Sequence, residues 1–328
     1  MNHLSPLRAP GLYVGAYAAS PSHSEWKPEE EAAYLGALAQ IPEITGLELP
    51  FHGFLHKHDP EWLLAHLKPS WNYVITGIPG TMEILSRMPR FGLASDAEEG
   101  RGAAIAFAQQ ALLSVQRLNR HFGRETVAAV EIHSAPKLGA AEASSSVRAL
   151  VESLREIAAW DWQGAELMVE HCDRYVETRP GAKRFLALED ECRAVAETGP
   201  ARTPLSVLIN WGRSALEEQD ADAPVRHLNL ARMSGCLGGL MFSGCTAGDP
   251  QSPYGDWMDS HAPFRGVDGS FPHSLLDLAR TREALRAADW RQLRVLGLKM
   301  QALPKTLTTE ERIHWVRQWV GFLQMALG

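Results

Sequence analysis

Ionisable side chains follow an apolar run in residues 164–175, GAELMVEHCDRY. Glu170, His171, Cys172 and Asp173 come at the end of this run. A strand that is apolar along its length has both faces covered, so polar groups at its last residues lie at the end of a sheet. Ligands bind at the carboxyl ends of strands in open α/β sheets and in (β/α)8 barrels. The pattern therefore favours a ligand site over a strand end with solvated charges.

The same pattern recurs at the ends of other predicted strands. Glu48 lies in GLEL, Glu131 and His133 lie in VAAVEIHSAP, Asn210 ends LSVLIN, and Lys299 follows RVLGL. Residues two apart share a face of a strand, so we expect one inward-facing group, called the polar ring: Glu48, Glu131, His133, Glu170, Asn210 and Lys299. Three carboxylates this close cannot all ionise without a cation, which is either a bound metal or Lys299.

Each member of the polar ring also has an ordinary structural explanation. Glu48 can pair with a neighbouring cation, His133 can be a core histidine, and Lys299 can be an edge lysine with a buried stem. Glu170 is the residue most strongly expected to be functional. The neighbouring residues expected to be structural are His171, Cys172, Asp173 and Cys245.

Eight segments are predicted to be strands, and helices are predicted between them. The strands are 12–19, 46–51, 71–78, 127–132, 164–175, 205–209, 237–242 and 295–300. The helices begin near residues 28, 60, 95, 146, 183, 223, 273 and 308. Strict alternation predicts a parallel sheet, and eight units in this length predict a single closed (β/α)8 TIM barrel over residues 1–328, with its active site at the carboxyl ends of the strands.

Helix-start signals support these boundaries. Asp59 precedes a proline and is expected to cap the second helix. Ser95 with Glu98, and Thr308 with Glu311, have the spacing of capping boxes, in which each side chain bonds the other residue's backbone.

Composition is that of an ordinary soluble protein, with 45% hydrophobic and 22% charged residues and a net charge of -7. There is no basic block, so we expect no nucleic-acid partner. The first fifteen residues lack a charged segment followed by a long apolar run, so we expect no secretory signal, and no stretch is long enough to span a membrane. Four cysteines without a C-x-x-C pair indicate reduced thiols and a cytoplasmic protein.

The segments LELPFHG, VEIHSAP and LMVEHCD together resemble the xylose-isomerase-like TIM-barrel superfamily, which also contains endonuclease-type barrels. Within it, WNYVITGIPGTM, FSGCTAGDPQSPYGDWMDSHAPF and LKMQALP are similar to an uncharacterised bacterial group, the YihM-like proteins, described as sugar isomerases. The resemblance covers nearly the whole chain. It implies the fold more specifically than the function, because one fold hosts many chemistries.

The resemblance also implies a divalent metal held by a Glu on strand five and by ligands after strands six, seven and eight. Glu170 matches the first position, and Asn210 stands at the second. Ser243 or Cys245 stands at the third position and Lys299 at the fourth. A lysine in place of a carboxylate repels a cation, so the usual metal centre is not expected to be intact.

The function favoured by these residues is a sugar, sugar-acid or sugar-phosphate isomerase or epimerase. Glu170 and Glu131 are the expected acid and base, because neighbouring carboxylates can have pKa values pushed apart. Lys299 is expected to replace the metal and to stabilise a developing negative charge on oxygen. The ligand would be a small carbohydrate-like molecule.

Other residues are expected to bind the substrate. His133, Asn210 and Arg213 would hold hydroxyls or an anionic group, with Glu48 and His52 at the neighbouring strand end. A long loop of about 243–270, which contains Tyr254 and Trp257, would cover the substrate. Of the histidines at 52, 56 and 58, only His52 is expected in the site, and the others are expected to be largely solvated.

Three alternatives remain open at this point. Glu131, His133, Glu170 and Asn210 could form a non-standard site for Mn, Mg or Zn. A non-catalytic sugar-binding barrel is a second reading, motivated by the departures from the metal pattern. An AP-endonuclease-like nuclease is less favoured, because the chain is acidic. Barrels of this kind often form homo-oligomers.

Overall fold

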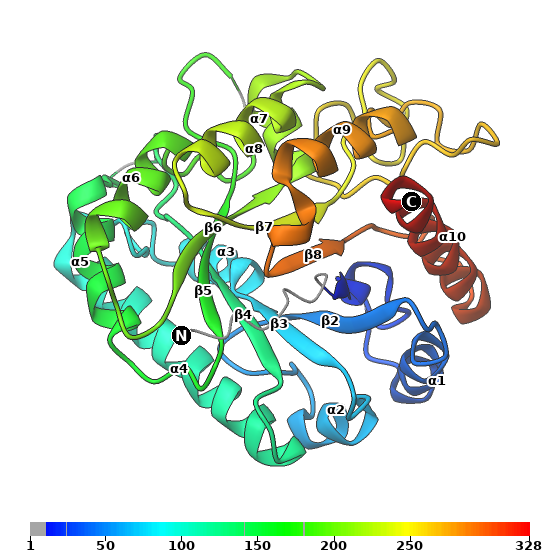
Figure 1. The fold of residues 1–328 in the computed structure, drawn as a ribbon, viewed down its shortest axis with the longest axis horizontal. Helices are drawn as coiled ribbons and strands as arrows, with labels where there is room; N and C mark the ends of the chain where they lie inside the picture. The colour runs from blue at the N-terminus through cyan, green and yellow to red at the C-terminus, as the bar shows by residue number, and fades with distance from the viewer. Residues whose placement is uncertain (1–10, 24, 141, 180) are drawn as a thin grey trace, which may run out of the picture.

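A computed structural model describes residues 11–23, 25–140, 142–179 and 181–328. Most of the segment that bears on a secretory signal, residues 1–10, lies outside this range. Eight parallel strands form a closed barrel in sequence order, and helices surround it (Figure 1). The strands are β1 (Leu12–Val14), β2 (Ile44–Pro50), β3 (Asn72–Thr76), β4 (Val127–Ile132), β5 (Glu166–His171), β6 (Leu205–Asn210), β7 (Leu237–Phe242) and β8 (Val295–Leu298). The predicted (β/α)8 barrel is confirmed.

The helices between the strands cover the outside of the barrel. They are α1 (Pro28–Leu38), α2 (Pro60–His66), α3 (Ile78–Leu85), α4 (Glu98–Phe122), α5 (Val147–Ala158), α6 (Leu188–Thr198), α7 (Trp211–Glu218), α8 (Ala223–Met233), α9 (Leu278–Ala288) and α10 (Thr309–Leu327), with 3-10 turns η1 (Ala16–Ala19) and η2 (Trp290–Gln292). The last helix, α10, packs beside α1 and so joins the two ends of the chain.

Several predicted boundaries differ from the structure. The first strand ends at Val14, and residues expected to continue it form η1. Pro79 does not close a strand but lies in the first turn of α3, where its missing N–H is not needed. The predicted Ser95–Glu98 capping box is wrong, because Ala97 is the N-cap residue and α4 begins at Glu98.

Other helix starts agree with the prediction. Asp59 caps α2 by accepting a hydrogen bond from the Trp62 N–H. Thr308 and Glu311 form the predicted capping box of α10, in which each side chain bonds the other residue's backbone. The helices predicted to begin near residues 183 and 273 begin later, at Leu188 and Leu278.

Two apolar cores fix which way each strand faces. A small cluster inside the barrel includes Val74, Ala129, Met168, Leu208 and Met241. The larger cluster lies between the barrel and the helices. Because alternate residues share a face, the inward-facing positions two residues further along these five strands are Thr76, Glu131, Glu170, Asn210 and Ser243. The barrel therefore presents polar side chains at the carboxyl ends of its strands.

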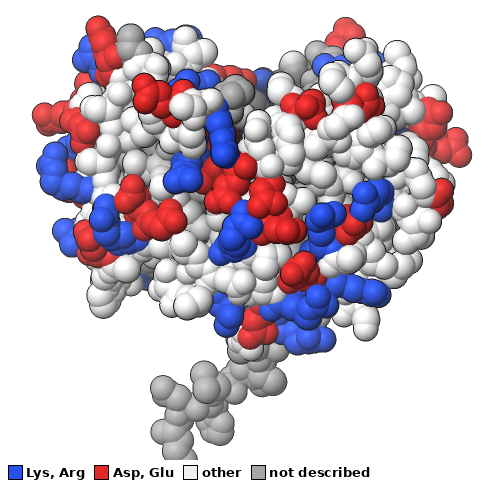
Figure 2. Space-filling model, turned by 90° about the horizontal axis from the view of Figure 1, so that it is seen from above, with Lys and Arg blue, Asp and Glu red and all other residues white. Residues whose placement is uncertain are grey.

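Acidic and basic side chains are intermixed on the face of the molecule shown in Figure 2. No helix among the described residues combines the length and the apolar character that crossing a membrane requires.

Candidate active site

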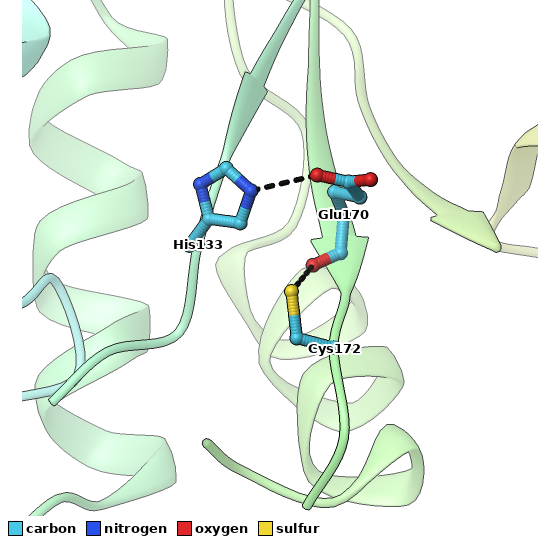
Figure 3. Close-up of side chains that lie close together, drawn as sticks. All are labelled: His133, Glu170 and Cys172. Atoms are coloured by element: carbon cyan, nitrogen blue, oxygen red, sulfur yellow. Dashed lines mark hydrogen bonds and ion pairs between the residues drawn. The ribbon is translucent and has the colours of Figure 1, made fainter. Parts of the chain in front are cut away.

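Glu170 is the centre of the polar ring and is fully buried. Arg213 Nη1 lies 2.6 Å from its Oε1, and Lys299 Nζ lies 3.6 Å from the same oxygen. His133 Nε2 lies 2.9 Å from the other oxygen, Oε2 (Figure 3). Asn210 adds a hydrogen bond from Nδ2 to Oε1 at 3.3 Å. Glu170 therefore joins side chains from β4, β6, α7 and the end of β8.

Lys299 also pairs with a second carboxylate, which lies across the barrel from Glu170. Its Nζ donates to Glu48 Oε1 at 2.8 Å, and both side chains are fully buried. Gly15 makes this packing possible, because a Cβ at that position would lie 2.4 Å from Glu48 Oε2 and 2.9 Å from Lys299 Cβ. Burial alone would lower the pKa of Lys299, but Glu170 and Glu48 raise it well above its usual value. Lys299 is thus the cation among the carboxylates.

Glu131 and Glu170 have opposite ionisation behaviour. Burial, and then the charges of Glu48 and Glu170, raise the pKa of Glu131 well above its usual value. Burial would also raise the pKa of Glu170, but Arg213 and Lys299 hold it well below its usual value. Neither carboxyl oxygen of Glu131 has a hydrogen-bond partner among the described residues. The surroundings therefore favour the protonated form of Glu131 and the ionised form of Glu170.

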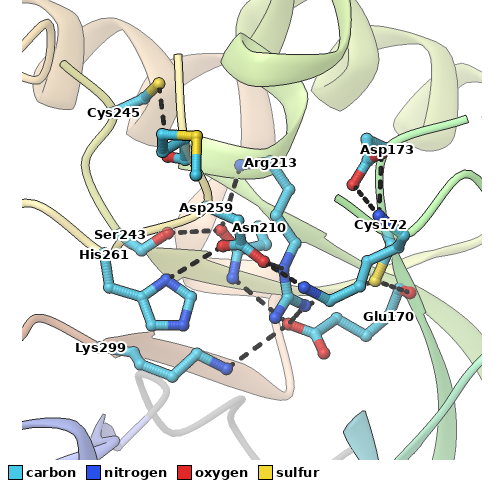
Figure 4. A network of polar contacts seen from close by, with 12 residues as sticks. Glu170, Cys172, Asp173, Asn210, Arg213, Ser243, Cys245, Asp259, His261 and Lys299 are labelled. Atoms are coloured by element: carbon cyan, nitrogen blue, oxygen red, sulfur yellow. Dashed lines mark hydrogen bonds and ion pairs between the residues drawn. The ribbon is translucent and has the colours of Figure 1, made fainter. Parts of the chain in front are cut away.

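A second layer of contacts connects the ring to the long loop after β7 (Figure 4). Arg213 Nε lies 3.2 Å from Asp259 Oδ2, and Lys183 Nζ lies 2.6 Å from the same oxygen. His261 Nδ1 lies 3.3 Å from the other oxygen of Asp259. Burial lowers the pKa of His261 to about 3, so its imidazole is neutral. Asp259 thus ties the loop to the charged groups of the site.

Two cavities lie above the polar ring. One of about 280 Å³ is lined by residues that include Trp26, Glu48 and His52. The other, of about 270 Å³, is lined by residues that include Lys183 and Arg213. Tyr17 lines both, and Lys299 Nζ lies 6.0 Å from the centre of its ring. Glu131, Glu170 and Lys299 lie deeper in the ring and are fully buried.

The structure brings all predicted members of the polar ring together, as well as Arg213. His52 lies apart from Glu170, on the wall of the first cavity, with its Nδ1 3.0 Å from Glu83. Tyr254 donates its hydroxyl hydrogen to the carbonyl of Gln301, and Trp257 packs against the apolar core. Neither of these two aromatic residues is among those that line the two cavities.

Sequence reasoning missed three residues of the site. Tyr17 was placed within a strand, and Lys183 and His261 were not considered. None of them had a usable local signal, because their positions depend on how loops fold back over the barrel. His56 was expected to be solvated, but its Nδ1 accepts hydrogen bonds from the N–H groups of His58 and Asp59.

The outward-facing neighbours of Glu170 form a separate network, as expected. His171 Nδ1 lies 2.7 Å from Glu191, and its Nε2 lies 3.0 Å from Glu217. Burial would lower the pKa of His171, but Glu191 and Glu217 raise it to about 10. Asp173 accepts hydrogen bonds from the backbone of Lys183.

The metal site of the superfamily can be tested against these contacts. His133, Glu170 and Cys172 form a buried group whose ligand atoms lie within 4.8 Å of one another. Two cations, Arg213 and Lys299, already approach the Glu170 carboxylate and would repel a divalent ion. Asn210 Oδ1 accepts from Ser243 Oγ at 2.6 Å. The residues therefore do not fit the usual metal centre.

The fold is shared with solved structures of xylose-isomerase-like and sugar phosphate isomerase/epimerase proteins. A sugar phosphate isomerase/epimerase from Parabacteroides distasonis matches 99% of this chain and 98% of its own, with 10% identity and a TM-score of 0.53. A xylose isomerase domain protein from Alicyclobacillus acidocaldarius matches 97% and 99%, with 14% identity and a TM-score of 0.56. IolI, solved with a zinc atom, matches 96% and 98%, with 12% identity and a TM-score of 0.59.

A more specific relationship comes from sequence. Residues 13–315 match the model of a family described as a domain of unknown function, DUF4862, and the chain belongs to this family. The uncharacterised protein STM3670 of Salmonella typhimurium is 35% identical over 96% of this chain and 97% of its own. The resemblance to an uncharacterised group within the superfamily is confirmed.

Proposed function

We propose that this protein is a sugar isomerase or epimerase that uses lysine and arginine in place of the superfamily's metal. The observation that carries the proposal is the difference between two buried carboxyls of one ring: Glu170 pairs with Arg213 and has a lowered pKa, whereas Glu131 has no hydrogen-bond partner among the described residues and has a raised pKa. Environments that push two pKa values apart assign an acid and a base. The sugar isomerase and epimerase names among the fold neighbours support the reaction class.

In the proposed reaction, the Glu170 carboxylate removes a proton from the carbon next to the substrate carbonyl. The electron pair of that C–H bond moves into an enediolate, and Lys299 stabilises the negative oxygen. Glu131 then gives its proton to the intermediate, and the next turnover or solvent restores both groups. Substrate oxygens that engage Arg213 and Lys299 would release Glu170 from its ion pairs and raise its basicity.

Substrate would reach these groups from the two cavities that meet at Tyr17. His133, Asn210 and Arg213 would orient its oxygens, since all three already bond Glu170. The loop that carries Asp259 would close over the second cavity, held by Lys183 and Arg213.

A non-catalytic sugar-binding barrel is the second candidate. The observation that favours it is the complete burial of Glu170 and Lys299, which pair with each other. Arg213 also pairs with Glu170, and Glu48 also pairs with Lys299. In that case the ring would be a charged core, and only the cavities would contact a ligand.

Proton exchange with solvent separates the two candidates. The protein would be incubated with a panel of aldoses and ketoses in D₂O, and proton NMR would follow the carbon next to each carbonyl. We expect the native protein to exchange that hydrogen for deuterium, with no loss of rate after chelator treatment, and the Glu131→Gln variant to be at least about 100-fold slower. Sugars that bind without exchange would leave the binding barrel as the function.

A further inference from the structure

A second group of metal-ligating side chains lies outside the barrel, on the face of β5 opposite to Glu170. His171 from β5, Glu217 from α7 and His227 from α8 are buried, and their ligand atoms lie within 4.8 Å of one another. We propose that these three residues, with Glu218 as a fourth ligand, bind a divalent transition metal of the zinc class. We call this group the outer cluster.

The spacing of the donor atoms suits a tetrahedral ion. His171 Nε2 lies 3.0 Å from Glu217 Oε2, and His227 Nε2 lies 4.0 Å from Glu217 Oε1. Glu218 Oε1 lies 3.4 Å from His227 Nε2. Zinc bonds of about 2.1 Å place tetrahedral ligand atoms roughly 3.4 Å apart. The observed distances lie on both sides of that value, so small side-chain movements would complete the site.

Supporting contacts orient the histidines for this role. The Glu191 carboxylate holds His171 Nδ1 at 2.7 Å and accepts a hydrogen bond from Ser134 through its other oxygen. A carboxylate on the far nitrogen fixes the tautomer that directs Nε2 at a metal. His227 Nδ1 has no hydrogen-bond partner among the described residues, so its proton can reside there and leave a lone pair on Nε2.

The charges around the outer cluster also favour a divalent cation. The acidic groups are Glu191, Glu217, Glu218 and Asp220, and the arginines paired with them are Arg174 and Arg226. With neutral histidines, two negative charges remain. A proton on His171 neutralises one of them, whereas a divalent ion in its place neutralises both. Glu218, Asp220 and Arg226 are partly exposed and so contribute less than the buried groups.

The outer cluster differs in this respect from the group of His133, Glu170 and Cys172. There, Arg213 and Lys299 already neutralise the carboxylate. Imidazole and carboxylate donors suit zinc. The cations paired with Glu217 and Glu218 are the exposed side chains of Arg174 and Arg226, which can move aside, whereas Arg213 and Lys299 are buried. Glu218, whose side chain is 28% exposed, gives an ion a path from solvent.

The experiment compares metal binding by variants of the two groups. Full-length protein freed of metal with a chelator would be dialysed against Zn²⁺, and bound metal would be measured by mass spectrometry, with Co²⁺ absorption reporting a tetrahedral site. We expect one equivalent in the native protein and a higher melting temperature with metal, because only the folded state contains the site.

The variants locate the ion. His227→Gln and Glu217→Gln should weaken binding at least about tenfold, whereas Cys172→Ala should bind as the native protein does. Circular dichroism would verify that each variant is folded, and His227→Gln, at the edge of the cluster, is the one least expected to disturb the fold. The proposal is overturned if the native protein binds no stoichiometric metal, or if Cys172→Ala loses the ion while His227→Gln keeps it. Neither result depends on catalysis at the polar ring.

Discussion

At the scale of single residues, the site rests on two carboxyl groups that differ in what surrounds them. Arg213, Lys299 and His133 all contact the carboxylate of Glu170. Glu131 lies near other carboxylates, and neither of its oxygens has a hydrogen-bond partner among the described residues. Burial penalises the charged form of both, but only Glu170 is compensated. The surroundings therefore favour a proton on Glu131 and a charge on Glu170.

This difference predicts how Glu131→Gln changes stability with pH. The native pKa of Glu131 is raised, so the wild type is most stable relative to the variant below pH 4.5, the ordinary value, and loses that advantage as pH rises toward the native pKa. Urea unfolding should show the variant gaining on the wild type by about 1.4 kcal/mol per pH unit in that range. A difference that does not change with pH would mean that Glu131 is ionised in the folded protein.

Glu170→Gln should lower the stability of the protein, because the charge that it removes is compensated in the native ring. Removing this charge leaves Arg213 and Lys299 buried beside a neutral amide, and breaking a buried pair costs about 3–5 kcal/mol. We therefore expect a large loss of stability in urea unfolding, together with a loss of activity. Glu142→Gln, at an exposed ion pair, is the control and should change stability by less than about 1 kcal/mol.

The alternation of residues made the polar ring predictable. Glu131 and Glu170 each lie two positions after an inward apolar residue, and this register carries directly from sequence to structure. Tyr17 and Lys183 were not predictable in the same way, because their positions depend on how η1 and the loop after β5 fold back over the barrel. The periodicity of a sequence does not indicate that a segment folds back over the barrel.

At the scale of elements, the chain just after β1 passes close to the ion pair between Glu48 and Lys299, and Gly15 leaves room for these two side chains. Gly15→Ala would place a Cβ within 3 Å of both Glu48 and Lys299, so these side chains must shift. We expect a loss of about 1–3 kcal/mol by chemical denaturation. Gly36→Ala, on exposed α1 with open space around the added carbon, is the matched control and should stabilise the helix by up to about 1 kcal/mol. Equal effects at the two sites would contradict this account.

Helix α7 carries the main connection between the ring and the loop after β7. Arg213 contacts Glu170 through Nη1 and Asp259 through Nε. A lysine is a point charge that cannot reproduce this planar fork, so Arg213→Lys should release Asp259. Hydrogen exchange should become faster in residues 248–271, while Arg226→Lys, at an exposed pair, should leave that loop unchanged. Unaltered exchange in Arg213→Lys would show that Lys183 alone holds the loop.

Two helices, α3 and α7, were not predicted because their first residues had a second interpretation. Pro79 and Gly80 have the composition of a turn, yet both lie in the first turn of α3. Asn210 was assigned to the polar ring, and it also caps α7 by accepting a hydrogen bond from the Arg213 N–H. Asn210 thus ends β6, caps α7 and donates a hydrogen bond to Glu170. Helix and strand propensities do not distinguish these roles.

At the scale of the whole molecule, the charges of the cavities and of the ring beneath them balance. The basic residues are Lys57, Lys183, Arg213 and Lys299, and the acidic residues are Glu31, Glu48, Glu170 and Asp259. Glu131 is left out of this balance because its raised pKa favours its neutral form. An anionic substrate would therefore enter without a compensating positive charge, and desolvating its charge would reduce affinity. Neutral hydroxyl groups, in contrast, can donate hydrogen bonds to the carboxylates and accept them from the lysines and arginine.

We therefore predict that an uncharged sugar binds better than its phosphate. Matched pairs of a hexose and its 6-phosphate would be compared by thermal shift and by calorimetry. The neutral member of a pair should give the larger rise in melting temperature, and its affinity should not depend on salt, because no net charge is screened. Tighter binding of the phosphate that weakens with added salt would show instead that Lys183 and Arg213 are free to bind an anion, so that Asp259 would have to move away from them when substrate enters.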